Sequence, residues 1–193
     1  MPLSTFKLCD ASGHPAVREV CEQDFIRIDI PGPGPKVGNG YDWVNVKIVR
    51  DEMIAEGDLF SIQVKPSPHP LEPTGPIAHF LDSDASSTFQ IRRIATTVYA
   101  EEHARNESPN LKTGNKLDNL RNGIVGTAAS LGLSYPQWKS LVNGLVERRL
   151  VLSHMTVAHQ LFCDECFRRS GCIFYWVLPV TEKWPDICKY LTN

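Results

Sequence analysis

The sequence predicts an α+β fold: a mostly antiparallel, meandering β-sheet of five to six strands, covered on one face by a C-terminal helical hairpin plus a third helix. The main observation is a change of period near residues 110–114. Apolar residues alternate at every second position before this point and recur every three to four positions after it. The predicted strands are joined by short connections, which is typical of antiparallel neighbours. We therefore expect β-structure first and helices afterwards.

A single domain is expected for a chain of 193 residues. It divides into a β-rich half at 25–107, a helical hairpin at 114–149 and a cysteine-rich C-terminal segment at 150–193. A formal net charge of −2 gives no general attraction to nucleic acid or to anionic lipid. The longest apolar run, Cys172–Pro179, is too short to cross a bilayer, and no secretory signal precedes it. We expect a cytoplasmic protein without membrane association, for which nucleic acid is an unlikely partner.

The first predicted strand is Phe25–Ile30, where Ile26, Ile28 and Ile30 alternate with polar residues, so that one face can be buried. Prolines between residues 31 and 35 end this strand, because proline cannot donate to a strand ladder. Alternation also predicts the strands Tyr41–Val49, Leu59–Lys65, Ile77–Leu81, Thr88–Arg92 and Thr97–Arg105. Late in the chain, Cys172–Leu178 indicates a short buried strand or an extended core segment.

The helical half begins with Asn115–Leu131, which Gly132 follows as a C-terminal stop. Its apolar residues share one helix face: Leu117, Leu120, Ile124, Val125, Ala128 and Leu131. We expect this face to be buried against the sheet.

A second helix follows the capping box Ser134-Tyr135-Pro136-Gln137, in which the serine and glutamine side chains satisfy backbone donors. It carries apolar residues at helical spacing: Trp138, Leu141, Val142, Leu145 and Val146. Because the connection is so short, the two helices should form an antiparallel hairpin, Asn115–Arg149, on the inner face of the sheet. A third helix is predicted over Ser153–Arg169.

The C-terminal segment contains a candidate metal site. Imidazole and thiolate are the donors that zinc prefers, and Cys163 and Cys166 have a common ligand spacing. On a helix His159 shares their face, Cys172 lies just beyond a Ser-Gly turn, and His154 is a further donor nearby. The opposing interpretation is a group of buried thiols, because free cysteine is among the most buried residue types. Zinc is the one candidate ligand, and no other cofactor is expected.

The strand Thr97–Arg105 is the second candidate site, because its alternation places Tyr99, Glu101, His103 and Arg105 on one face. A phenol, a carboxylate, an imidazole and a guanidinium in one row suit acid–base chemistry or the binding of an anion. The simpler interpretation is a polar face in water, with the charges balanced by an ion pair from Arg92 to Glu101 or its neighbour.

A third group, His79 with Asp82 and Asp84, offers donors for a divalent cation or a hydrolytic dyad. Aspartates among serines are, however, typical turn residues. No nucleophile elbow accompanies the group.

The expected function is binding or protein–protein interaction, as in an inhibitor, immunity-type or regulatory protein, because no nucleophile, base and orienting group occur at motif spacing. One alternative is a small enzyme acting on a small anionic substrate, with His103 as acid or base, Glu101 as its orienting group or partner base, Arg105 as the anion clamp and Tyr99 beside them. The other alternative is a carrier of a small apolar ligand. The sequence leaves the oligomeric state open.

Overall fold

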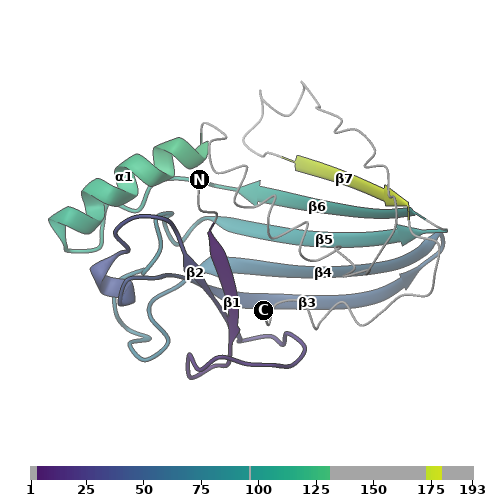
Figure 1. Cartoon of the computed structure of the whole chain (residues 1–193), viewed down its shortest axis with the longest axis horizontal. Helices are drawn as coiled ribbons and strands as arrows, with labels where there is room; N and C mark the ends of the chain where they lie inside the picture. Colours follow the sequence, from purple (N-terminus) through teal and green to yellow (C-terminus); the bar gives the residue numbers. More distant parts are fainter. Residues whose placement is uncertain (1–3, 96, 131–172, 180–193) are drawn as a thin grey trace, which may run out of the picture.

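The computed structural model of the chain describes residues 4–95, 97–130 and 173–179, which form one curved antiparallel sheet and one α-helix (Figure 1). Six strands pair in chain order: β1 (Thr5–Cys9), β2 (Phe25–Asp29), β3 (Asp42–Ile54), β4 (Gly57–Pro66), β5 (Ser86–Ile94) and β6 (Thr97–Arg105). A further strand, β7 (Ile173–Pro179), pairs with β6, and the helix α1 (Lys116–Ser130) follows β6 in the chain. The predicted α+β class and antiparallel meander are confirmed.

The strands differ from the prediction at two places. The strand β1 was not predicted, because Leu8 and Cys9 are consecutive buried residues that interrupt the alternation. The predicted strand Ile77–Leu81 is an irregular segment instead. Its carbonyl groups accept hydrogen bonds from two different places, at Ala78 from the amide of Trp43 (2.7 Å) and at Phe80 from the amide of Asn110 (2.8 Å). No single neighbouring strand runs along it, so no ladder forms.

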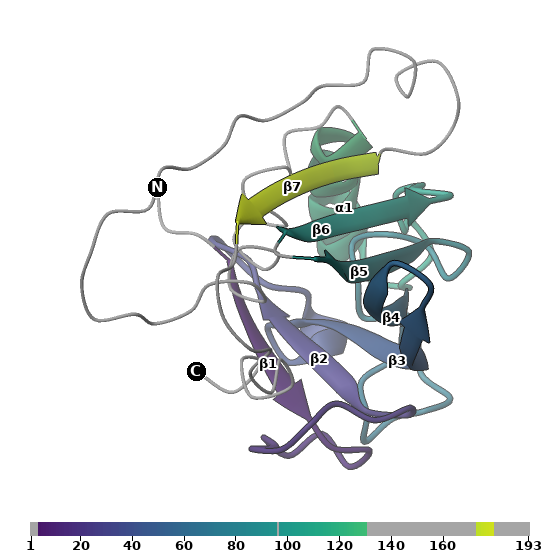
Figure 2. The ribbon, with the colours of Figure 1, turned by 90° about the vertical axis from the view of Figure 1, so that its right-hand side faces the viewer.

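The core lies on the inner face of the curved sheet. The register places Phe60 and Ile62 of β4 opposite Ile91 and Phe89 of β5, so the predicted alternation fills one face with apolar side chains. The strand β3 shifts register between Val46 and Ile48, and such a bulge bends a strand. Figure 2 shows the result, with β1 and β2 running steeply across the direction of β6 and β7. Residues from β1 and β2 therefore join the same core as those of β4 to β6.

The helix α1 lies at the end of the sheet, beside the end of β6, and not over the middle of its inner face (Figure 1). Val125 reaches the main core, but Leu117, Leu120 and Ile124 are 63%, 64% and 65% exposed. The prediction that these residues are buried against the sheet is therefore wrong. The reason is that the opposite side of α1 carries polar residues with specific partners in the adjacent loops.

The second helix of the predicted hairpin and the third helix, Ser153–Arg169, lie outside the described residues. Within the described part of the chain, no helix is long and apolar enough to cross a membrane.

Candidate functional site

A buried ion pair attaches α1 to the beginning of β3. The guanidinium of Arg121 donates two parallel hydrogen bonds to Asp42, from Nη1 to Oδ1 (3.0 Å) and from Nη2 to Oδ2 (2.5 Å). Asp42 is completely buried and also accepts the amide of Phe80 (2.9 Å), while Arg121 Nε donates to the carbonyl of Pro33 (3.0 Å). A bidentate pair of this kind fixes the orientation as well as the position of the helix.

The first turn of α1 is held by a second carboxylate. Asp118 is buried and accepts the backbone amides of Lys36 (3.1 Å) and Val37 (3.2 Å), which belong to a short 3-10 helix, Lys36–Gly38. The loop that presents these amides closes tightly on itself, because a Cβ at Gly34 would collide with the carbonyl group of Gly40. The sequence Asp118-x-x-Arg121 thus anchors one side of α1 to the loop between β2 and β3.

Amide side chains complete this anchor. Asn122 is fully buried and its Nδ2 donates to the carbonyl groups of Asn110 (3.0 Å) and His79 (3.4 Å). The side chain of Asn110 donates in turn to the carbonyl groups of Ile77 (3.0 Å) and His79 (3.1 Å). We call five residues the polar anchor, of which four are buried and the Arg121 side chain is 11% exposed: Asp42, Asn110, Asp118, Arg121 and Asn122. Sequence reasoning missed it, although Asp118, Arg121 and Asn122 recur at helical spacing opposite the leucines of α1.

The imidazole of His79 lies beside the polar anchor. It is fully buried, stacks on Phe80 at 4.2 Å between ring centroids, and accepts the amide of Leu81 at Nδ1 (3.0 Å). Because Nδ1 is an acceptor, the neutral ring carries its proton on Nε2, which has no hydrogen-bond partner in the described structure. Burial, together with the charge of Arg121, lowers the pKa of His79 to about 3. His79 is therefore a neutral core residue at physiological pH.

The rest of the third candidate group does not join His79. Asp82 pairs with Lys112 at 3.0 Å and accepts the amide and hydroxyl of Ser83, which is turn chemistry. Within the described residues, no cluster of histidine, cysteine, aspartate and glutamate has the geometry of a metal site. The zinc candidates His154, His159, Cys163, Cys166 and Cys172 lie outside those residues.

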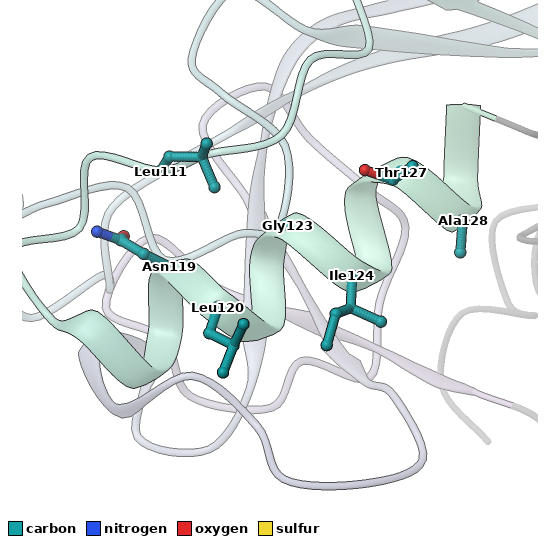
Figure 3. Close-up of a pocket in the computed structure, with 7 residues that line it drawn as sticks. All are labelled: Leu111, Asn119, Leu120, Gly123, Ile124, Thr127 and Ala128. Atoms are coloured by element: carbon teal, nitrogen blue, oxygen red, sulfur yellow. The ribbon is translucent and has the colours of Figure 1, made fainter.

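Because the polar anchor occupies the inner side of α1, the apolar side faces outward. We call the exposed residues Leu111, Leu117, Leu120 and Ile124 the α1 stripe. Figure 3 shows Leu120 and Ile124 projecting from the same side of the helix, with Leu111 approaching from the preceding loop. Next to them runs an open groove of about 620 Å³, lined by Leu111, Asn119, Leu120, Gly123, Ile124, Thr127 and Ala128. Leu111 lies beside Gly123, where an added Cβ would be in van der Waals contact with its Cδ2 at 3.7 Å.

Part of the predicted polar row on β6 forms a cluster of side chains that contact one another. Glu101 is only 4% exposed, and its carboxylate bonds His103 Nε2 through Oε2 (3.0 Å) and Arg92 Nη2 through Oε1 (3.2 Å). The guanidinium of Arg92 lies 5.2 Å from the ring centre of Tyr99. Arg105 is exposed at the end of the strand and takes no part in these contacts. The Arg92 to Glu101 ion pair weighed in the simpler interpretation is present, but Glu101 does not face water.

On the other face of β6, Glu102 is 1% exposed in the apolar layer, directly opposite Phe89. Its Oε1 has no hydrogen-bond partner in the described structure, and a hydrogen bond with Ser87 supports the carboxyl group. Burial, and secondarily the nearby Glu107, raise the pKa of Glu102 to about 8. The sequence does carry a signal for this buried acid, because Glu102 occupies a position of β6 that alternation assigns to the inner face of the sheet.

No family model, curated protein or solved structure matches this chain. The function is therefore argued from the arrangement of its own residues.

Proposed function

We propose that this protein is a protein-interaction domain whose docking surface is the α1 stripe and the adjoining groove. The observation that carries the proposal is the packing of α1, in which the polar residues Asp118 and Asn122 are buried while Leu117, Leu120 and Ile124 are exposed. Single exposed leucines are common on protein surfaces, but a contiguous apolar patch is typical of an interaction site.

The rigid support of the stripe favours this interpretation. The bidentate contact between Arg121 and Asp42, and the two amides that Asp118 accepts, hold α1 in one orientation. A surface that is already fixed in its binding conformation loses little conformational entropy when a partner docks.

The shape and chemistry of the groove favour a protein over a small polar ligand. The groove is open, and among its lining residues only Asn119 and Thr127 have polar side chains. An amphipathic helix fits such a surface, because its apolar residues at positions i, i+3, i+4 and i+7 can lie along a groove of this kind.

The test combines footprinting with partner capture. Hydroxyl-radical footprinting of the full chain at low concentration should label Leu120 and Ile124 strongly, compared with the core residue Ile62. Capture from a lysate should then retrieve proteins with the wild type and with the control Leu71→Glu, which charges an exposed leucine outside the stripe and the groove lining. The double variant Leu120→Glu/Ile124→Glu should lose them. Strong protection of the stripe, or equal capture by all three proteins, would contradict the proposal.

A second candidate function is an enzyme or anion-binding site at the β6 cluster, favoured by the 3.0 Å contact between His103 and Glu101. A buried carboxylate that holds an imidazole is the arrangement used to orient a general acid or base. Titration with inorganic phosphate and citrate, followed by NMR of the histidine rings, tests this alternative. Shifts at His103 and not at the exposed His14 would support it, and equal shifts at both rings would count against it.

A further inference from the structure

The charges of the β6 cluster, formed by Arg92, Tyr99, Glu101 and His103, do not balance when the imidazole is protonated. One carboxylate serves two groups, because Glu101 contacts Arg92 Nη2 through Oε1 (3.2 Å) and His103 Nε2 through Oε2 (3.0 Å). The guanidinium is always charged, and histidine ordinarily gains its charge between about pH 8 and pH 5. With a protonated imidazole, the cluster therefore carries one positive charge in excess.

The contact with Glu101 determines which atom of His103 can meet a ligand. A carboxylate accepts hydrogen bonds, so Nε2 carries a proton and is already used, and His103 makes no other hydrogen bond within the described residues. Its side chain is 26% exposed, against 4% for Glu101, so the imidazole and not the carboxylate is accessible. The remaining nitrogen, Nδ1, can donate a hydrogen bond to an anion only after it takes up a proton.

Further donors lie next to this nitrogen on β5. The register places Gln90 opposite Glu101 and Thr88 opposite His103, and residues paired in this way have Cβ atoms about 5 Å apart. The side chain of Arg92 is 34% exposed, and its hydrogen bond to Glu101 is the only one that it makes in the described structure. An anion at Nδ1 can therefore reach unused donors of the neighbouring strand.

The other positions that face the imidazole add no negative charge. Arg105, two positions further along β6, is exposed and positively charged. On β5 and β4, Thr88 and Gln63 face it and bond each other at 3.4 Å, and on β7 the register places Ile173 opposite. Glu101 is the one carboxylate at these facing positions of the described strands, and it is already shared by two partners.

We propose that the β6 cluster binds a small oxyanion together with one proton, which is held on Nδ1 of His103. This inference rests on the second candidate function, since it states what anion binding at the cluster requires, and it does not involve the α1 stripe. The proton comes from solvent, and no covalent bond of the anion changes. Because protonation and anion binding favour each other by the same factor, the affinity for the anion falls as the pH rises.

Sulfate is the probe, because it remains a dianion over the whole pH range and takes up no proton itself. Isothermal titration calorimetry of the full chain, in buffers that differ in ionisation enthalpy, measures the affinity and the number of protons taken up. The wild type should bind sulfate roughly tenfold more tightly at about pH 5.5 than at about pH 8. Proton uptake should approach one per sulfate where the free imidazole is neutral.

Three variants test the charge count, and one serves as control. His103→Gln should abolish the proton uptake and the pH dependence, whereas His14→Gln, at a side chain that is 77% exposed, should retain both. Arg92→Gln should weaken sulfate binding at either pH, because it removes the permanent positive charge. Glu101→Gln should act in the opposite direction and let sulfate bind at about pH 8, since it removes the balancing carboxylate.

The outcomes separate this inference from the second candidate function. Sulfate that binds at His103 without proton uptake would overturn the inference and leave a simple anion site. Equal affinity and uptake in the wild type and His103→Gln would mean an adventitious ion only, which also overturns it. A chain that binds no sulfate at either pH would overturn both the inference and anion binding as a function of the cluster.

Discussion

The strands of the sheet and the helix at its end are held by opposite kinds of side chain. In β4 and β5, the inward positions are apolar, as at Ile62 and Phe89, and the packing follows the alternation of the sequence. In α1 the inward positions are Asp118, Arg121 and Asn122, and the leucines face outward. The hydrophobic period therefore indicates the buried face correctly in the sheet and incorrectly in the helix.

The difference shows how specific hydrogen bonds can determine which face of a helix is buried. An apolar face gains stability from any apolar surface, whereas the polar anchor matches particular amides and carbonyl groups of three loops. A helix with this anchor can leave its leucines exposed, where they are available to a partner.

The largest effect is expected from Arg121→Ala, which leaves the buried carboxylate of Asp42 without its cation. We expect a loss of about 4 kcal/mol in the free energy of unfolding, because removing one member of a buried ion pair leaves the other charge buried without a partner. Urea denaturation checks this, with the exposed Arg50→Ala as the matched control. A loss below about 1 kcal/mol, the range of surface pairs, would mean that polar contacts do not hold α1.

The sheet has its own buried acid, and Glu102→Gln should remove the pH dependence that this acid gives to stability. Since the folded-state pKa of Glu102 is raised to about 8, the folded protein keeps a proton that the unfolded chain releases above its ordinary pKa near 4.5. The wild type therefore loses stability as the pH rises from 4.5 to 8, by about 3 kcal/mol between pH 5 and pH 8. The variant should lack this loss, and the exposed Glu52→Gln should behave like the wild type. Parallel stability profiles for the wild type and Glu102→Gln would refute a protonated Glu102.

A smaller pH effect of opposite sign is expected at the α1 end. The pKa of His79 is lowered to about 3 in the folded protein, so the unfolded chain binds the extra proton below pH 6.5 and stability falls as the pH falls toward 3. The loss between pH 7 and pH 5 is about 2 kcal/mol. His79→Asn, which keeps an acceptor for the amide of Leu81, should lack this loss, whereas His14→Gln should retain it. Urea denaturation at both pH values measures the difference, and an unchanged loss in His79→Asn would assign the acid sensitivity to other groups.

The smallest effect is expected from Leu120→Ser. An exposed leucine contributes little to folding, so the free energy of unfolding should change by less than about 0.5 kcal/mol under dilute conditions. Ile62→Ser in the sheet core should cost more than about 3 kcal/mol by the same measurement. A large loss in Leu120→Ser would show that the stripe is covered within the folded chain.

The sequence predicted β2 to β6 and α1 because each carries a regular period, and it predicted the β6 row because Tyr99, Glu101 and His103 alternate. It did not predict the polar anchor. Arg121 binds Asp42 and the carbonyl group of Pro33. Nothing in the local sequence around Arg121, or around residues 33 and 42, indicates that these two segments are in contact. The burial of Glu101 could not be predicted for a similar reason, since alternation defines a face but not what covers it.

The anchor also has a consequence for the order of folding. The two charged contacts that hold α1 join it to positions about 80 residues earlier, since Asp118 and Lys36 are separated by 82 positions and Arg121 and Asp42 by 79. Hairpins such as β3 with β4 close over short loops, whereas these contacts require a long loop to close and the receiving segments to be in place. We therefore expect α1 to attach last on the folding pathway and to detach first when the native protein opens locally.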